Sequence, residues 1–174
     1  MTDPLLDAIR TVPDFPEPGI QFKDITPVLA DPRLFSEAVD RLKAPFSGAA
    51  ITHVIGIESR GFWFGAALAE RLHAGFVPAR KPGKLPAATL RETYDLEYGT
   101  DALEIHADAL PENAHVLVHD DVIATGGTAA AAARLAERAG ALVIGFSFFV
   151  ELGFLGGVAK LPAGVPVRSV LRIE

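Results

Sequence analysis

Residues 116–128, Val-Leu-Val-His-Asp-Asp-Val-Ile-Ala-Thr-Gly-Gly-Thr, constrain the fold of this chain more than any other segment. An apolar run, two carboxylates and a glycine pair before an alanine-rich stretch predict a strand over residues 116–119, then a loop and a helix start. Glycine lets the backbone approach a ligand closely, and the free N–H groups of a helix start favour an anion. We therefore expect a phosphate group to bind at Ala124, Thr125, Gly126, Gly127 and Thr128.

Asp120 and Asp121 directly precede this loop, where they cannot bind phosphate themselves. Carboxylates suit ribose hydroxyl groups, or a magnesium ion that is held through water or substrate. A sugar phosphate would therefore satisfy both parts of the segment. His119 is either a packed neutral side chain or a group that tunes Asp120, and we favour the packed neutral histidine.

Short apolar runs alternate with helical patterns, which predicts an α/β fold with a mainly parallel sheet. The expected strands are residues 53–57, 75–79, 104–107, 116–119, 142–150 and 167–171. The expected helices are residues 4–10, 32–43 with Asp31 as cap, 62–73, and 127–139 with Gly140 as its end.

Two further loops carry charge at the ends of expected strands, where open α/β sheets bind ligands. Residues 58–61, Glu-Ser-Arg-Gly, hold either ligand-binding groups or a surface ion pair between Glu58 and Arg60. Arg80, Lys81 and Lys84 form the one clearly basic spot, which would suit pyrophosphate. Residues 87–100 then read as a long mobile excursion, with strand character at 94–98, that would act as a lid.

The chain has 174 residues, 49% of them hydrophobic and 22% charged, which indicates one folded domain over residues 1–174. It has no cysteine, which excludes disulfides and thiolate metal sites and is compatible with the cytoplasm. The net charge of −6 and the lack of a basic block argue against nucleic-acid binding. Residues 1–10 do not resemble a signal peptide, and glycines break residues 141–159, which favours a buried strand and a loop over a membrane span.

Several other segments match one family in order. Residues 15–27 read Phe-Pro-Glu-Pro-Gly-Ile-Gln-Phe-Lys-Asp-Ile-Thr-Pro, and residues 76–86 read Phe-Val-Pro-Ala-Arg-Lys-Pro-Gly-Lys-Leu-Pro. Residues 94–99 read Tyr-Asp-Leu-Glu-Tyr-Gly, and residues 103–106 read Leu-Glu-Ile-His. Together with Glu-Ser-Arg-Gly-Phe at 58–62 and the segment 116–128, they resemble the adenine-type enzymes of the type I phosphoribosyltransferase family. The resemblance covers roughly residues 13–161, and its departures are His119, usually aliphatic, and Lys23, often arginine.

The resemblance implies the type I phosphoribosyltransferase fold, with a small N-terminal hood over about residues 1–30 and a flexible catalytic loop over about residues 81–103. It also implies transfer of the phosphoribosyl group from phosphoribosyl pyrophosphate to adenine, giving AMP and pyrophosphate, with Mg²⁺ and as a homodimer. The metal would be held through substrate and water, not directly by the protein.

The family's site residues carry over position by position. The resemblance implies that residues 124–128 bind the 5′-phosphate and that Asp120 and Asp121 face the ribose. It implies that Arg60, Lys81 and Lys84 serve the pyrophosphate side, next to Arg80 of the same basic spot. Adenine would contact the backbone of Gln21 to Lys23, with the ring of Phe22 beside it. A lone aromatic residue such as Phe22 could also be a core residue. Glu97 and Tyr98 come down with the loop, where Glu97 is either an acid/base or orienting group or a solvated glutamate.

Three rivals remain open. A guanine or xanthine phosphoribosyltransferase would differ in the blocks at 15–27 and 94–99, which here look adenine-type. A regulator that binds the sugar pyrophosphate without turnover would want a basic nucleic-acid surface. A non-catalytic ribose-phosphate module would have no need of Glu97, Tyr98 and the cations.

Overall fold

A five-stranded parallel sheet forms the centre of the computed structural model, which describes residues 3–95 and 99–174. Its strands lie in the order β4 (Gly75–Ala79), β3 (His53–Ile57), β7 (His115–Ile123), β8 (Leu142–Leu152) and β9 (Val167–Ile173). Each neighbouring pair is parallel. The expected α/β fold with a mainly parallel sheet is therefore confirmed.

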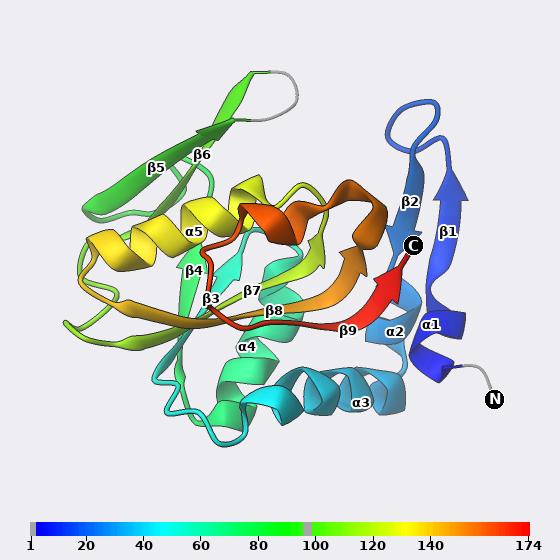
Figure 1. Ribbon diagram of the computed structural model, residues 1–174, viewed down its shortest axis with the longest axis horizontal. Coiled ribbons are helices and arrows are strands. Elements are labelled where there is room, and N and C mark those ends of the chain that lie inside the picture. Colours follow the sequence, from blue (N-terminus) through cyan, green and yellow to red (C-terminus); the bar gives the residue numbers. More distant parts are fainter. Residues whose placement is uncertain (1–2, 96–98) are drawn as a thin grey trace.

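Helices cover both faces of this sheet (Figure 1). Helices α3 (Pro32–Lys43) and α4 (Gly61–Leu72) lie on one face, and α5 (Gly127–Arg138) lies on the other. The predicted cap of α3 is confirmed, because the Asp31 carboxylate accepts hydrogen bonds from the backbone N–H groups of Arg33 and Leu34. Short one-turn helices connect elements at η1 (Ala44–Phe46), η2 (Gly153–Leu155) and η3 (Gly157–Lys160).

The core has two parts, one under each helical layer. On the α5 side, a run of small alanines at 129–133 is buried against Ile55, Val116 and Val118, which lets the helix lie close to the strands. On the other side, aromatic and aliphatic side chains of α4 pack on the sheet, as Phe64 does against Phe149 at 4.9 Å between ring centroids. Because both faces are covered, the central strands are apolar along most of their length.

Two antiparallel hairpins stand at opposite ends of the sheet (Figure 1). The N-terminal one pairs β1 (Arg10–Pro13) with β2 (Gln21–Asp24) and is flanked by α1 (Pro4–Ala8) and α2 (Thr26–Ala30). The other pairs β5 (Thr89–Asp95) with β6 (Thr100–His106) in seven register pairs. The carboxylate of Glu92 on β5 fastens this second hairpin to α5, through Arg134 at 2.6 Å and Arg138 at 3.0 Å.

The second hairpin corrects two predictions. Residues 87–95 are not a free excursion, because Thr89–Asp95 forms a strand. The strand character expected at 94–98 is confirmed for Tyr94 and Asp95, and residues 96–98 lie outside the described part of the chain. The strand expected at 104–107 belongs to this hairpin and starts at Thr100, outside the parallel sheet. Polar residues dominate β5, so its order comes from pairing with β6 and from ion pairs to α5, which are tertiary contacts.

Two boundaries also differ from the prediction. The first helix ends at Ala8, and Arg10 already belongs to β1. Strand β7 runs on to Ile123 because β8 continues to pair with it, for example Asp120 with Phe148. The two carboxylates of the 116–128 segment are thus strand residues, although we expected the strand to end at His119.

His119 is a packed neutral histidine, as the sequence favoured. It is 0% exposed, and burial lowers the pKa of its imidazole to about 3. Within the described residues neither ring nitrogen has a hydrogen-bond partner, and the same holds for the buried hydroxyl of Ser147, its register partner on β8. The apolar stretch 141–159 forms β8 and the turns η2 and η3, and none of the described helices is long and apolar enough to cross a membrane.

Replacing His119 with leucine should remove a pH dependence of stability. Below its ordinary pKa of 6.5 the imidazole of the unfolded chain takes up a proton that the folded chain refuses, so this residue lowers stability as the pH falls. The loss amounts to about 2 kcal/mol between pH 7 and pH 5. Chemical denaturation of wild type and His119→Leu across that range should give curves that diverge at low pH; parallel curves would contradict the assignment.

Candidate functional site

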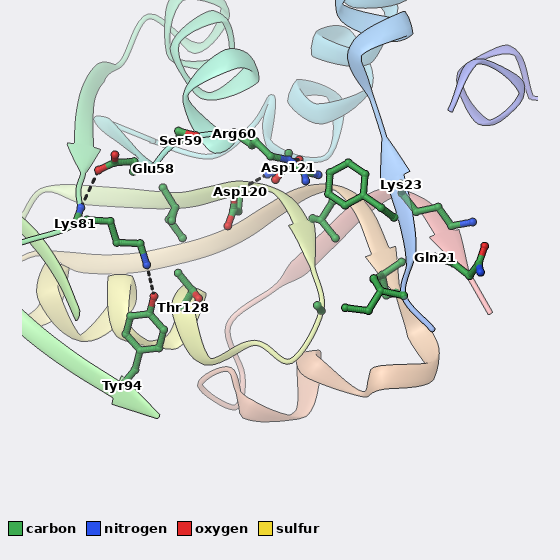
Figure 2. A pocket seen from close by; sticks show the side chains of 16 residues that line it. Gln21, Lys23, Glu58, Ser59, Arg60, Lys81, Tyr94, Asp120, Asp121 and Thr128 are labelled. Atoms are coloured by element: carbon green, nitrogen blue, oxygen red, sulfur yellow. Dashed lines mark hydrogen bonds and ion pairs between the residues drawn. The ribbon is translucent and has the colours of Figure 1, made fainter. Parts of the chain in front are cut away.

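The main pocket lies at the carboxyl ends of β3 and β7, between the two hairpins, with a volume of about 500 Å³ (Figure 2). This is the edge where parallel α/β sheets bind ligands. Residues of three loops and of both hairpins line it: Ile20, Gln21, Phe22, Lys23, Ile57, Glu58, Ser59, Arg60, Lys81, Tyr94, Asp120, Asp121, Val122, Ala124, Thr128 and Leu152. The structure therefore brings the predicted phosphate loop, the acid pair, the hood and two of the predicted cations, Arg60 and Lys81, into one cavity.

A smaller hollow of about 90 Å³ adjoins the pocket at the start of α5. Its wall includes Ala124, Thr125, Gly126 and Thr128, while Gly127 begins the helix behind it. Gly126 has a φ of 79°, a conformation that glycine adopts without strain, and it turns the chain so that α5 starts at the hollow. A helix start with two threonines at a small hollow suits a phosphate group.

This loop also rests on Gly157, which the sequence analysis did not single out. A Cβ atom on Gly126 would run into the backbone of Gly157, and one on Gly157 would run into the Ala124 carbonyl. The start of η3 thus packs backbone against backbone next to the phosphate loop. The glycines at 153, 156 and 157 were visible in the sequence, but only the fold shows which of them touches the loop.

The two adjacent carboxylates have different surroundings. Asp121 is 4% exposed, and its carboxylate accepts a hydrogen bond from Arg60 Nε at 2.6 Å and forms an ion pair with Arg60 Nη2 at 2.5 Å. Asp120 faces the pocket, and burial first and the charge of Asp121 second raise its carboxyl pKa well above the ordinary value. A hydroxyl donor or a hydrated cation at Asp120 would favour its ionised form.

Close packing holds Asp120 in place. A Cβ atom on Gly61, at the start of α4, would lie 2.9 Å from its Oδ1. The backbone N–H of Asp121 donates to the same oxygen at 2.9 Å. The glycine of the Glu-Ser-Arg-Gly segment is therefore needed for the helix to approach the acid pair.

Arg60 links the acid pair to the hood. Its guanidinium lies over the ring of Phe22, with 4.8 Å from Cζ to the ring centroid, while it pairs with Asp121. Phe22 is half-buried on the pocket wall and also meets Phe15 edge-on at 5.1 Å. The interpretation of Phe22 as a core residue is therefore wrong, and an ion pair between Glu58 and Arg60 does not form either.

Glu58 instead binds the basic segment after β4. Its carboxylate lies 2.6 Å from Lys84 Nζ and 3.4 Å from Arg80 Nε, and it accepts a hydrogen bond from the backbone N–H of Lys81 at 2.8 Å. These cations hold the pKa of the Glu58 carboxyl below its ordinary value, against the effect of burial. Arg80 and Lys84 thus lie beside the pocket, whereas we expected them to face it together with Lys81.

Lys81 reaches into the pocket and meets the second hairpin (Figure 2). Its Nζ donates to the Tyr94 hydroxyl at 3.0 Å and to the Asp101 carboxylate. Neither Tyr94 nor Asp101 was assigned a role from the sequence, because only the pairing of β5 with β6 brings both to Lys81.

The hood contributes backbone atoms and the aromatic ring of Phe22 to the pocket wall. Figure 2 shows the side chains of Gln21 and Lys23 pointing away from Asp120 and Thr128. Lys23 Nζ donates to the hydroxyl of Thr11 on β1 at 2.9 Å, outside the pocket. The side chain at position 23, where the family often has arginine, is thus turned away from the pocket. Glu97 and Tyr98 lie outside the described residues, where the structure does not test them.

No group of three or more histidine, aspartate or glutamate side chains that could hold a metal occurs in the part of the chain described. The donors that could serve a cation are the paired carboxylates Asp120 and Asp121, next to the phosphate hollow.

The chain is similar to known proteins over most of its length. The phosphoribosyl transferase domain family matches residues 33–153. The chain is 59% identical to the adenine phosphoribosyltransferase of Gloeobacter violaceus, over 92% of this chain and 94% of that protein. The chain belongs to the adenine phosphoribosyltransferase family.

Solved structures of this family superpose closely. The adenine phosphoribosyltransferase of Rhodothermus marinus has a TM-score of 0.94 and 61% identity, and the match covers 97% of this chain and 96% of that one. The Saccharomyces cerevisiae enzyme has a TM-score of 0.90 and 44% identity, over 96% of each chain. That structure was solved with D-2,5-dideoxy-2,5-imino-altritol 1,6-bisphosphate and adenine.

Gly157→Ala should weaken sugar-phosphate binding, because the added methyl group would push the Ala124 carbonyl and the loop off the hollow. Overpacking by one methyl group costs about 1–3 kcal/mol. If binding bears this cost, the affinity for ribose 5-phosphate falls by about tenfold, which calorimetry measures. Gly48→Ala is the matched control, because nothing lies near a Cβ atom there. Equal affinity in wild type and both variants would show that the loop does not depend on Gly157.

Proposed function

We propose that this protein transfers the 5-phosphoribosyl group from phosphoribosyl pyrophosphate to adenine, giving AMP and pyrophosphate in purine salvage. The observation that carries the proposal is the continuity of the site. A phosphate hollow at Ala124–Thr128 opens past two carboxylates into a pocket with an aromatic wall at Phe22 and a cation at Lys81. The reaction is a glycosyl, specifically pentosyl, transfer.

The 5′-phosphate anchors the substrate in this proposal. The N–H groups at the start of α5 and the hydroxyls of Thr125 and Thr128 bind it. Asp120 and Asp121 then face the ribose hydroxyls. Burial and the charge of Asp121 raise the pKa of the Asp120 carboxyl, which favours its protonated form. A ribose hydroxyl that donates a hydrogen bond to Asp120 stabilises the ionised form instead. Ribose binding and ionisation of Asp120 therefore favour each other.

The departing pyrophosphate meets Arg60 and Lys81 in the pocket, while Arg80 and Lys84 add positive charge from beside it. As the bond from C1′ to pyrophosphate breaks, positive charge develops on the ribose and negative charge on the leaving group. Each of these cations is paired with a carboxylate of the protein. A pyrophosphate oxygen therefore either displaces that carboxylate from the cation or binds the cation beside it. Mg²⁺ bound through substrate and water would neutralise further charge on the leaving group, and the acid pair suits such a cation.

Adenine lies against the hood, with the backbone of Gln21 to Lys23 as its hydrogen-bonding edge and Phe22 beside its ring. The side-chain directions of Gln21 and Lys23 support a contact through backbone. Glu97 and Tyr98 close over the reacting atoms and keep water from the cation-like centre; Glu97 orients adenine or exchanges its proton.

Four broader parts of the proposal follow the family. The chain works as one domain, in which about residues 1–30 form the hood and about residues 81–103 the catalytic loop. It uses Mg²⁺, acts as a homodimer and operates in the cytoplasm. Large apolar side chains exposed on the monomer, such as Trp63 at 41% and Phe154 at 64%, offer surface that a second copy could bury.

A base panel tests the activity. Purified protein with Mg²⁺ and phosphoribosyl pyrophosphate should form nucleotide from adenine, and not from guanine, hypoxanthine, xanthine or orotate. Chromatography of the products measures this directly. Turnover of another base would overturn the assignment of the hood, and binding of the sugar pyrophosphate without turnover of any base would make the protein a regulator.

Asp121→Asn should raise the KM for phosphoribosyl pyrophosphate by about tenfold or more, and the affinity for adenine far less. The change removes one charge of the acid pair and the buried partner of Arg60, an effect of about 1.5–3 kcal/mol for hydrogen bonds to charged groups. Steady-state kinetics with each substrate varied in turn measures both values. Asp40→Asn, which removes an exposed ion pair with Arg71, is the control. Unchanged kinetics in Asp121→Asn would remove the acid pair from the site.

A further inference from the structure

We propose that Asp101, together with Tyr94, is a positioning residue that holds the Lys81 ammonium group at the pocket wall for an oxygen of the pyrophosphate group. The inference deepens the proposed function and rests on its placement of pyrophosphate at Lys81. It concerns two residues of the second hairpin that the sequence did not single out.

The geometry comes from strand pairing. Tyr94 on β5 and Asp101 on β6 are direct register partners, so their side chains leave the hairpin on the same face. That face meets Lys81, which follows the end of β4. The phenol and the carboxylate each accept a hydrogen bond from Lys81 Nζ, and the Tyr94 hydroxyl donates to Asp101 Oδ2 at 3.3 Å. The three groups therefore form a closed network.

Hydrogen-bond capacity leaves one donor for a ligand. A lysine ammonium has three N–H groups, and Asp101 and Tyr94 take two. The flexible four-carbon chain of a free lysine would lose rotamer freedom on binding, by up to about 2 kcal/mol. Here the hairpin has already restricted it, so an incoming pyrophosphate oxygen meets a placed donor.

The charge balance agrees with this role. The hydrogen bonds that Lys81 Nζ donates to Asp101 and Tyr94 keep the pKa of Lys81 above its ordinary value although burial opposes them, and Lys81 lowers the pKa of the Asp101 carboxyl. Lys81 is thus held charged in a half-buried position. Among the three basic residues that follow β4, it lines the pocket, whereas Arg80 and Lys84 pair with Glu58 beside it.

Asp101→Asn and Tyr94→Phe test the inference. Each should raise the KM for phosphoribosyl pyrophosphate and the dissociation constant of magnesium pyrophosphate by about tenfold, the value of one hydrogen bond to a charged group. The KM for adenine should stay within about twofold, and Asp101→Glu should recover most of the loss. Tyr94→Phe removes only a hydroxyl, so it keeps the test valid if Asp101→Asn unfolds.

A double-mutant cycle with Lys81→Met separates positioning from general damage. In the Lys81→Met background, Asp101→Asn should have no further effect on pyrophosphate binding. Asp40→Asn is the matched control, because it breaks an exposed ion pair with Arg71 that involves neither Lys81 nor the second hairpin, and pyrophosphate affinity should stay unchanged.

Either of two results would overturn the inference. Equal pyrophosphate affinity in wild type and both single variants would show that the network is structural only. Tighter binding in Asp101→Asn would show that this carboxylate competes with pyrophosphate for Lys81. Calorimetry with magnesium pyrophosphate needs no turnover, so a protein that makes no AMP but shows the predicted coupling would refute the proposed function and not this inference.

Discussion

The burial of β7 between β3 and β8, under helices on both faces, is the constraint on which the rest of the structure depends. A strand in this position has to be apolar wherever the helices cover it. Val116, Leu117 and Val118 are accordingly apolar and fully buried. Carboxylates fit where the strand leaves that cover. Asp120 and Asp121 stand at this point, and the turn into α5 follows at once, which puts acids and phosphate loop a few residues apart. His119, one residue before Asp120, still lies under the helices, and its imidazole stays neutral because it is buried.

Charge pairing inside the site is the second organising feature. Arg60 pairs with Asp121, Arg80 and Lys84 with Glu58, and Lys81 with Asp101. A pocket for a highly charged ligand therefore keeps little unbalanced charge of its own. Uncompensated cations at partly buried positions would cost stability, and internal carboxylates remove that cost. The same carboxylates decide where each cation points, so they shape the site as much as the cations do.

Much of the fold could be predicted from the sequence, and the failures have one cause. Two strands and the helix at Pro32–Lys43 were predicted at the observed bounds, because local apolar periodicity and the Asp31 cap signal them within a few residues. The strand Thr89–Asp95 and the extension of β7 to Ile123 were missed. Both depend on pairing with another strand, β6 for the first and β8 for the second, and charged residues interrupt the local apolar pattern in each.

The sequence by itself determined which residues bring chemistry to this protein: the acid pair, the glycine–threonine loop, the cations and the hood. Residue type and spacing suffice for that, because they are local. Only the tertiary structure decided which partner each group takes. It brought Arg60 to Phe22 and Asp121, turned Lys23 away toward Thr11, and set Gly157 beneath the phosphate loop. Ion pairs, hydrogen bonds and steric contacts act over a few ångströms of space, and distance along the chain does not predict them.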